Sequence, residues 1–389
     1  MMVKKHILPV IVLAQFCCTS LWFASNAIMQ DLVVAFGLPE TATGILTSAV
    51  QLGFISGTLL FAILTITDRY APSKVFFYCA LLGSLSNLAL IWQTHGLTSL
   101  FIARYATGFF LAGIYPVGMK IAADYYDKGL GTSLGYLVGA LVLGTSFPHY
   151  LKNFEEALPW TWVVMITSLI AALGGILLWS TVPNGPYRKP SQSLHWDAFI
   201  TVFRKPSFRQ AAFGYFGHMW ELYAFWAFVP FIIIAFNQLH AVQISVPIWC
   251  FITIGIGSLS CVASGYISMK IGAKNTATYA LLASAICCLL LPVVVLLGNV
   301  LVFLVFLIFW GMVVIADSPM FSTLVAKNAI PEFKGTALTI VNCIGFAITI
   351  ASIQLLTFLI TKTDSIAIYT VLVVGPIFGL YHLFLGKSQ

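Results

Sequence analysis

The stretch Ser207–Phe236, SFRQAAFGYFGHMWELYAFWAFVPFIIIAF, decides the fold. It is mostly apolar and long enough to cross a bilayer, whose hydrocarbon core takes about 20 residues of α-helix. Glu221 lies in its middle, with His218 one helical turn earlier. A carboxylate at the bilayer centre costs roughly 2.5–3.5 kcal/mol on insertion scales, so it must face a protein interior or a wet cavity. The stretch therefore predicts a membrane helix that belongs to a larger bundle with a polar centre.

The composition extends this interpretation to the whole chain. Of the 389 residues, 60% are hydrophobic and 8% are charged, a balance that excludes a soluble globular domain. The formal net charge is +7, but the basic residues sit in short loops between apolar runs, so nucleic-acid binding is not expected. The eight cysteines all fall inside apolar segments without zinc-ligand spacing, and neither a metal nor a cofactor is expected.

Hydropathy predicts an all-α polytopic membrane protein with twelve transmembrane helices in two pseudo-symmetric six-helix bundles. The N-terminal bundle covers residues 1–182 and the C-terminal bundle residues 207–389. Residues 183–206 form a cytoplasmic linker whose Leu194–Phe203 part is expected as an amphipathic helix on the membrane surface. The predicted spans are roughly 7–36, 41–67, 73–94, 97–126, 129–152, 159–182, 207–236, 245–268, 275–297, 299–326, 335–361 and 365–385.

Lysine and arginine set the expected orientation. Of the 19 such residues, Lys152 and Lys362 fall in loops on one side, Arg104 lies within a span, and all others fall on the opposite side. Because cytoplasmic loops carry the excess of basic residues, both termini are expected in the cytoplasm and the chain in the inner membrane. The apolar run after Lys4 and Lys5 has no small-residue cleavage site, so it is expected to remain as the first helix.

The two halves repeat each other. Gly108 and Pro116 in the fourth span recur as Gly311 and Pro319 in the tenth, at an offset of about 203 residues. A parallel repeat of six plus six spans is a known transporter architecture, with the substrate site between the halves at mid-membrane.

The loop Asp68-Arg69-Tyr70-Ala71-Pro72-Ser73-Lys74 resembles the signature loop between helices 2 and 3 of the major facilitator superfamily. Asp68, Arg69 and Lys74 match that pattern, while Leu64 and Ala71 stand where the family usually has glycine. The resemblance implies that these three charged residues act in gating. For the loop taken alone, the simpler explanation is the usual excess of lysine and arginine in cytoplasmic loops.

Arg104 followed by Gly108 is similar to the family's second motif, whose arginine points into the cavity. The resemblance implies a cavity cation at Arg104; snorkelling of Arg104 to the outer surface is the alternative. Further along the same span, Lys120 and Asp124 are four residues apart, and an interfacial ion pair between them is expected.

Glu221 and Asp317 are the acidic residues furthest from any loop, and both are candidates for proton coupling, with Glu221 first. Pro319 is expected to disturb the helix beside Asp317. His218 is a candidate partner of Glu221 or a substrate ligand. The alternative for each acid is a structural hydrogen bond between spans.

Several polar and aromatic residues are candidates for lining a substrate cavity. Together with Arg104 and His218 they are Trp22, Asn26, Gln51, Tyr115, Trp220, Tyr223, Trp226 and Asn342. Helix–helix packing explains any single one of them equally well.

The function predicted from these features is secondary active transport of a small organic solute by alternating access. The resemblance implies proton coupling, and symport is the first choice; efflux of a drug or metabolite is the alternative. Arg104 and the histidines favour an anionic or zwitterionic solute, whereas the two acids suit proton coupling or a cation. A membrane-embedded enzyme or receptor is the competing class, but the histidines are scattered, no catalytic set is evident, and no phosphate-binding loop appears. The expected partners are the solute, protons and membrane lipids, and the expected state is a monomer.

Overall fold

The computed structural model describes residues 6–126, 130–154, 159–188, 198–330 and 333–384, and these form helices with no strand among them. The chain divides into two compact units, Met1–Leu194 and His195–Gln389, each described below by itself. Lys4, Lys5, Lys128, Lys189 and Lys387, which contribute to the expected orientation, lie outside the described residues, as does the first part of the expected amphipathic helix.

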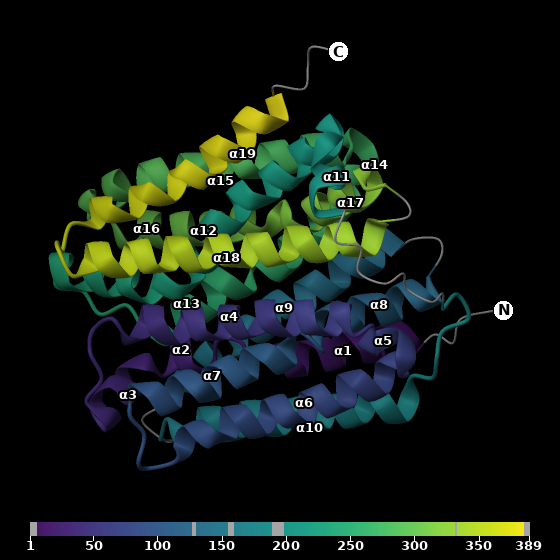
Figure 1. The fold of residues 1–389 in the computed structure, drawn as a ribbon. Coiled ribbons are helices and arrows are strands. Elements are labelled where there is room, and N and C mark those ends of the chain that lie inside the picture. Colours follow the sequence, from purple (N-terminus) through teal and green to yellow (C-terminus); the bar gives the residue numbers. More distant parts are fainter. Residues whose placement is uncertain (1–5, 127–129, 155–158, 189–197, 331–332, 385–389) are drawn as a thin grey trace. The chain divides into compact units, whose positions relative to one another are not determined.

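The first unit contains these helices: α1 (Ile7–Thr19), α2 (Ala24–Ala27), α3 (Met29–Phe36), α4 (Ala42–Ile63), α5 (Ile66–Arg69), α6 (Pro72–Leu88), η1 (Ala89–Ile91), α7 (Leu97–Leu111), α8 (Tyr115–Tyr125), α9 (Leu130–Lys152) and α10 (Thr161–Thr181). Within this unit α1 packs against α9 and α10, α6 packs against α7 and α10, and α4 packs against α7 (Figure 1).

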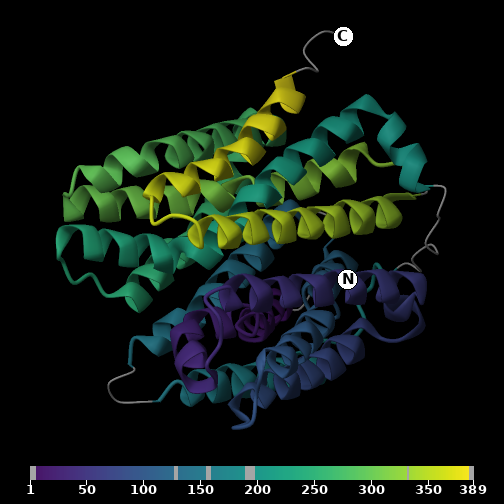
Figure 2. The ribbon, with the colours of Figure 1, turned by 60° about the vertical axis from the view of Figure 1, so that its left-hand side comes forward.

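The second unit contains α11 (Ala198–Arg204), α12 (Pro206–His240), α13 (Val246–Gly255), α14 (Gly257–Ile271), α15 (Ala273–Leu296), α16 (Val300–Ala316), α17 (Ser318–Asn328), α18 (Lys334–Ile360), η3 (Ile366–Val373) and α19 (Val374–Phe384). The long helix α12 carries the stretch Ser207–Phe236 and packs against α17, α18 and α19 of its own unit (Figure 2).

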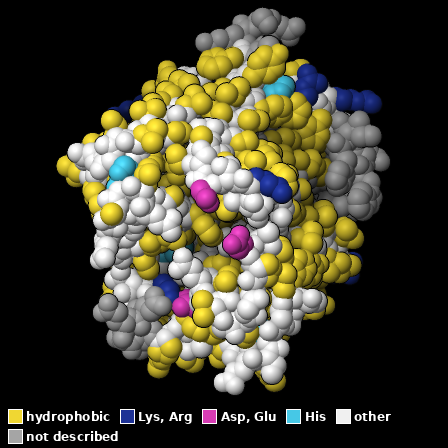
Figure 3. Space-filling model, turned by 90° about the vertical axis from the view of Figure 1, so that its left-hand side faces the viewer, with side chains coloured by type: hydrophobic (Ala, Val, Ile, Leu, Met, Phe, Trp, Pro, Cys, Tyr) yellow, Lys and Arg dark blue, Asp and Glu magenta, His cyan; other side chains and the backbone are white. Residues whose placement is uncertain are grey.

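Eleven segments within the described residues are long and apolar enough to cross a membrane. They match the predicted spans from the second to the twelfth, so the chain is a multi-pass membrane protein. Large apolar side chains such as Leu169 and Leu301 are 60% and 71% exposed, as expected where lipid tails replace water. Hydrophobic side chains cover much of the face shown in Figure 3, with charged side chains few and scattered among them.

The first predicted span, 7–36, differs from the prediction because it is divided into α1, α2 and α3. Near the end of α1, the hydroxyls of Thr19 and Ser20 donate to the carbonyls of Gln15 and Cys17, at 2.8 and 2.7 Å. Such local bonds compete with a regular helix. The carbonyls that follow are bound by Arg104, as described below, so that another partner replaces the helical bonds lost at the break.

The predicted fourth and tenth spans are each two helices in series. Helix α8 follows α7 with Pro116 in its first turn, and α17 follows α16 with Pro319 in its first turn. Proline lacks the N–H that would continue the preceding helix but fits the first turn of a new one. The predicted disturbance at Pro319 is confirmed, and it leaves Asp317 at the junction between α16 and α17.

The repeated glycines have the same structural role in both units. A Cβ atom on Gly108 would lie 2.0 Å from the carbonyl oxygen of Val50, and one on Gly311 would lie 1.9 Å from that of Thr253. Val50 and Thr253 are separated by the same offset as the two glycines. The repeat therefore preserves a close backbone contact, between α4 and α7 in one unit and between α13 and α16 in the other.

We expect Gly108→Ala and Gly311→Ala each to destabilise the protein by several kcal/mol, because backbone atoms must move apart to admit a methyl group. Gly265→Ala in α14 is the matched control, since a Cβ atom there would meet no heavy atom within 4 Å. Thermal unfolding of the purified variants in detergent measures the difference. Equal midpoints for Gly108→Ala and Gly265→Ala would contradict the assigned contact.

Candidate functional site

Arg104 is fully buried within the first unit. Its Nη1 donates to the carbonyl of Leu21 at 3.2 Å and to Oδ1 of Asn87 at 3.1 Å, and its Nη2 donates to the carbonyls of Leu21 and Trp22 at 3.2 and 2.6 Å. These carbonyls lie just beyond the C-terminal end of α1, where helix carbonyls lack partners and a positive charge is favoured. The guanidinium therefore caps the interrupted first span.

This position corrects the expectations for Arg104. Snorkelling is wrong because the side chain is 0% exposed. The implied role as a cavity cation receives no support from its contacts, since four of its five N–H groups are directed at protein oxygens. Asn87, which the sequence analysis missed, extends the network by donating to the hydroxyls of Thr167 and Ser168 in α10 at 3.2 and 3.0 Å. An asparagine inside an apolar span was the available signal.

The other candidates of the first unit lie near the break. The ring of Trp22 packs against that of Phe54 with centroids 4.9 Å apart, and Nδ2 of Asn26 donates to Oγ1 of Thr47 at 2.8 Å. Gln51 is fully buried on α4, whereas Tyr115 is half-buried at the first residue of α8. The first three are thus brought to one region of the unit.

Glu221 is 1% exposed and joins three helices of the second unit. Its Oε1 accepts hydrogen bonds from Oγ of Ser284 at 2.5 Å, Nε1 of Trp310 at 2.7 Å and Sγ of Cys288 at 3.3 Å. Ser284 and Cys288 are on α15 and Trp310 is on α16. All three donors are uncharged, an arrangement that suits a carboxyl group holding helices together.

His218 does not pair with Glu221, which corrects one of the two roles predicted for it. Its Nδ1 lies 2.8 Å from Oδ1 of Asp317, and both side chains are 1% exposed. The contact is an ion pair whenever His218 is protonated. Two titratable groups therefore meet at the junction between α16 and α17, with the ring of Tyr215 centred 6.0 Å from that of His218.

The aromatic candidates of α12 separate into two groups. Tyr223 packs against Trp226 and against Phe346 of α18, with centroids 5.3 and 5.2 Å apart. Trp220 instead donates from Nε1 to the carbonyl of Val371 in η3 at 3.2 Å, so it lies apart from the other two. Asn342 of α18 accepts a hydrogen bond from Tyr215, a residue that the sequence analysis missed, at 2.8 Å.

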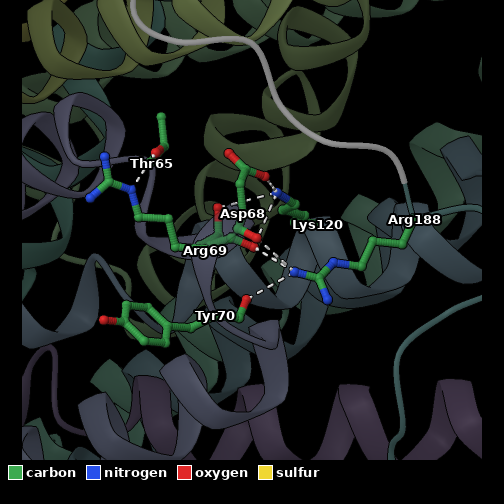
Figure 4. Close-up of polar contacts among 7 residues, drawn as sticks. Thr65, Asp68, Arg69, Tyr70, Lys120 and Arg188 are labelled. Atoms are coloured by element: carbon green, nitrogen blue, oxygen red, sulfur yellow. Dashed lines mark hydrogen bonds and ion pairs between the residues drawn. The ribbon is translucent and has the colours of Figure 1, made fainter.

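The charged loop between α4 and α6 is tied to its unit by two basic residues that the resemblance does not include (Figure 4). Lys120 of α8 forms an ion pair with Asp68 and also donates to Oγ1 of Thr67 at 3.2 Å. Arg188 donates from Nη2 to the carbonyls of Asp68 and Tyr70 at 3.1 and 3.0 Å. Lys120 thus forms its direct ion pair with Asp68, because α8 brings its lysine against the loop, and attracts the expected partner Asp124 only electrostatically, without a direct ion pair between these two described residues.

The other two charged residues of the loop make fewer contacts. Arg69 donates from Nε to Oγ1 of Thr65 at 3.2 Å, and Lys74 is exposed. Thr65 itself has a positive φ of 48°, which is costly for a β-branched residue. It directly follows Leu64, where the family usually has glycine, so the tight turn of the loop is kept here at the expense of backbone strain.

We expect Asp68→Asn to lower the rate of transport several-fold while leaving equilibrium solute affinity nearly unchanged, because the ion pair of Asp68 is with Lys120 beside the loop. The ion pair with Lys120 is partly exposed, so its loss should cost at most about 1 kcal/mol of stability. Transport assays and solute titrations on the same preparation measure both quantities, with Glu40→Gln, the same change from acid to amide at an exposed side chain, as control. Loss of solute binding in a folded Asp68→Asn protein would exclude a gating role.

The chain belongs to the Major Facilitator Superfamily, whose family model matches residues 11–381. The putative uncharacterized transporter YgaY of Escherichia coli strain K12 is 24% identical over 184 residues, which are 45% of each chain. The matched region thus spans about half the length of this curated relative.

Solved structures share the fold at low sequence identity. The proton:xylose symporter XylE has a TM-score of 0.75 at 14% identity, over 98% of this chain and 95% of that one. A bacterial homologue of the human lysosomal transporter Spinster has a TM-score of 0.73 at 14% identity, over 98% and 97%. These neighbours are transporters, and at this identity their likeness concerns the fold alone.

Proposed function

We propose that the chain is a secondary active transporter that moves a small organic solute across the inner membrane by alternating access. Membership of the superfamily and the eleven apolar segments of the described residues support this class over a membrane-embedded enzyme or receptor. The distribution of lysine and arginine supports cytoplasmic termini, which a reporter fused after Gln389 would test.

We further propose that transport is coupled to protons through His218 and Asp317. The observation that carries this proposal is the contact between two titratable side chains, each 1% exposed, at a helix junction inside an apolar span. Buried ionisable groups in membrane segments mark proton relays, and two groups in contact titrate as a pair. Glu221 and Tyr215 on α12 and Cys261 on α14 are the other titratable groups near this pair.

We rank Asp317 before Glu221, which is the reverse of the order expected from the sequence. Glu221 is held by three neutral donors from α15 and α16, and moving its proton would disturb the packing of those helices. Asp317 faces a histidine, which can take over or return a proton without large movement. Asp317 is therefore the first candidate for proton coupling and Glu221 the second.

Reconstitution into proteoliposomes tests the proposal. Uptake of labelled solute should rise when an inward proton gradient is imposed and fall when an uncoupler abolishes it. An exporter that exchanges a drug or metabolite for protons would instead accumulate the label only under an outward proton gradient. If the solute only equilibrates across the membrane and its uptake does not respond to the proton gradient, the protein is a transporter without proton coupling.

A further inference from the structure

Beyond the break in the first span, buried polar side chains of α2 and α4 lie together, and we call this group the polar seam. Its ends are fixed by the ring contact of Trp22 with Phe54 and by the hydrogen bond from Asn26 to Thr47. Thr47, Gln51 and Phe54 are four and three residues apart on α4, so they share one face of that helix. Gln51 therefore sits between the two contacts, on the face of α4 turned to α2.

Three polar atoms in this seam have no hydrogen-bond partner. They are Oδ1 of Asn26 and both Oε1 and Nε2 of Gln51, on side chains that are 7% and 0% exposed. A buried unsatisfied amide group costs about 1–3 kcal/mol, so a native protein keeps one only for a reason. The seam offers two acceptors and one donor group beside the indole of Trp22, a combination typical of solute sites.

The charged groups around the seam already have partners. Four N–H groups of Arg104 are bound to the carbonyls of Leu21 and Trp22 and to Asn87. Lys152 of α9 is paired with Asp31 of α3 at 2.6 Å. Nε of Arg104 has no hydrogen-bond partner, but the other four N–H groups of the guanidinium are occupied. Within this unit a charged solute would therefore lose hydration for little gain in charge pairing, which is costly in a buried site.

We propose that Asn26, Gln51 and Trp22 form a subsite for an uncharged solute rich in hydroxyl or amide groups. This proposal rests on the proposed transport function and names the solute class, in place of the anion or zwitterion that the sequence favoured. Hydroxyl or N–H groups of the solute would bind Oδ1 of Asn26 and Oε1 of Gln51, Nε2 of Gln51 would donate to a solute oxygen, and the indole would cover an apolar face.

Binding to the purified full-length protein in detergent tests the proposal without any gradient. The probes are D-xylose, myo-inositol and uridine as uncharged solutes, succinate as an anion, and glycine betaine as a zwitterion. Any solute that binds the folded state raises the midpoint of thermal unfolding by mass action. We expect at least one uncharged probe to raise it and the two charged probes to leave it unchanged.

Gln51→Leu removes the amide while keeping a similar volume. We expect it to abolish the rise in the thermal unfolding midpoint that uncharged probes cause. The midpoint without any probe should be equal or higher, because an unpaired buried group is removed. Gln51→Met, an unbranched side chain of similar length, repeats the test if leucine does not pack. Gln15→Leu is the matched control: Gln15 of α1 is also fully buried with both amide atoms unpaired, but it lies against Gly118 of α8, two helical turns before Trp22. It should keep the shift.

Three outcomes would overturn the proposal: shifts with charged probes only, no shift with any probe, or a shift that persists in both Gln51 variants. A lower unliganded midpoint in those variants would also overturn it, since Gln51 would then hold the structure together. These results are independent of proton coupling. If the subsite proposal fails, the proposal of proton coupling through His218 and Asp317 still stands. If the coupling proposal fails, the binding results in detergent still stand.

Discussion

Replacing Arg104 with leucine is expected to lower the stability of the folded chain by roughly 3–5 kcal/mol, the typical cost of removing one partner from a buried charged network. In this variant the carbonyls of Leu21 and Trp22 and Oδ1 of Asn87 lose the hydrogen bonds that the guanidinium donates to them. These oxygens are buried within a membrane-spanning helical unit, where water does not replace the lost hydrogen-bond donors. The α1 break should then lose its cap, and less folded protein should be recovered.

Two further variants separate this structural role from a role in solute binding. Arg104→Lys keeps the charge, but a single ammonium group cannot reproduce the planar fork that spans three oxygens, so we expect an intermediate loss. Arg69→Leu removes an exposed arginine and should change the unfolding midpoint little. If Arg104→Leu unfolds at the wild-type midpoint yet loses solute binding, the capping role is wrong and the cavity role implied by the family motif is restored.

The fold was predictable because bilayer thickness imposes length and apolarity on every span. The helices from α4 to α19 follow the predicted segments, and Pro319 correctly indicates the junction at Asp317. The division of the first span was not predictable from hydropathy, since the break at residues 20–23 is no less apolar than its surroundings. The hydroxyls of Thr19 and Ser20 compete with the helix locally, and Arg104, which is distant in sequence, replaces the missing helical bonds.

The sequence indicated which charged residues would be buried more successfully than it indicated their partners. Glu221, Asp317 and Arg104 were singled out because charge inside an apolar span must be compensated. Sequence spacing suggested that His218 pairs with Glu221 and Lys120 with Asp124, but both basic residues pair with acids from other helices. Helical spacing shows which residues share a face and not what packs against it, so partners from distant segments such as Trp310 and Arg188 were missed.

Asp317→Asn is expected to abolish proton-driven accumulation of solute while preserving solute binding and exchange. Asparagine has nearly the same shape and still offers an oxygen to His218, but it cannot bind or release a proton. A driving force of about 100 mV is worth roughly 2.3 kcal/mol per charge, so one proton per solute would support about 50-fold accumulation in the wild type. The variant should reach only the external concentration and lose the dependence of accumulation on pH.

Glu221→Gln is the matched comparison, since it makes the same change from acid to amide at a side chain that is equally buried in the same unit. Glutamine can still accept from Ser284 and Trp310 through Oε1, so the fold should persist and gradient-driven uptake should remain. The reverse result, with uptake lost in Glu221→Gln and kept in Asp317→Asn, would assign the coupled proton to Glu221 and the structural role to Asp317. Retention of uptake by both variants would exclude both acids, because neither amide can carry the proton that a symporter must bind on one side and release on the other.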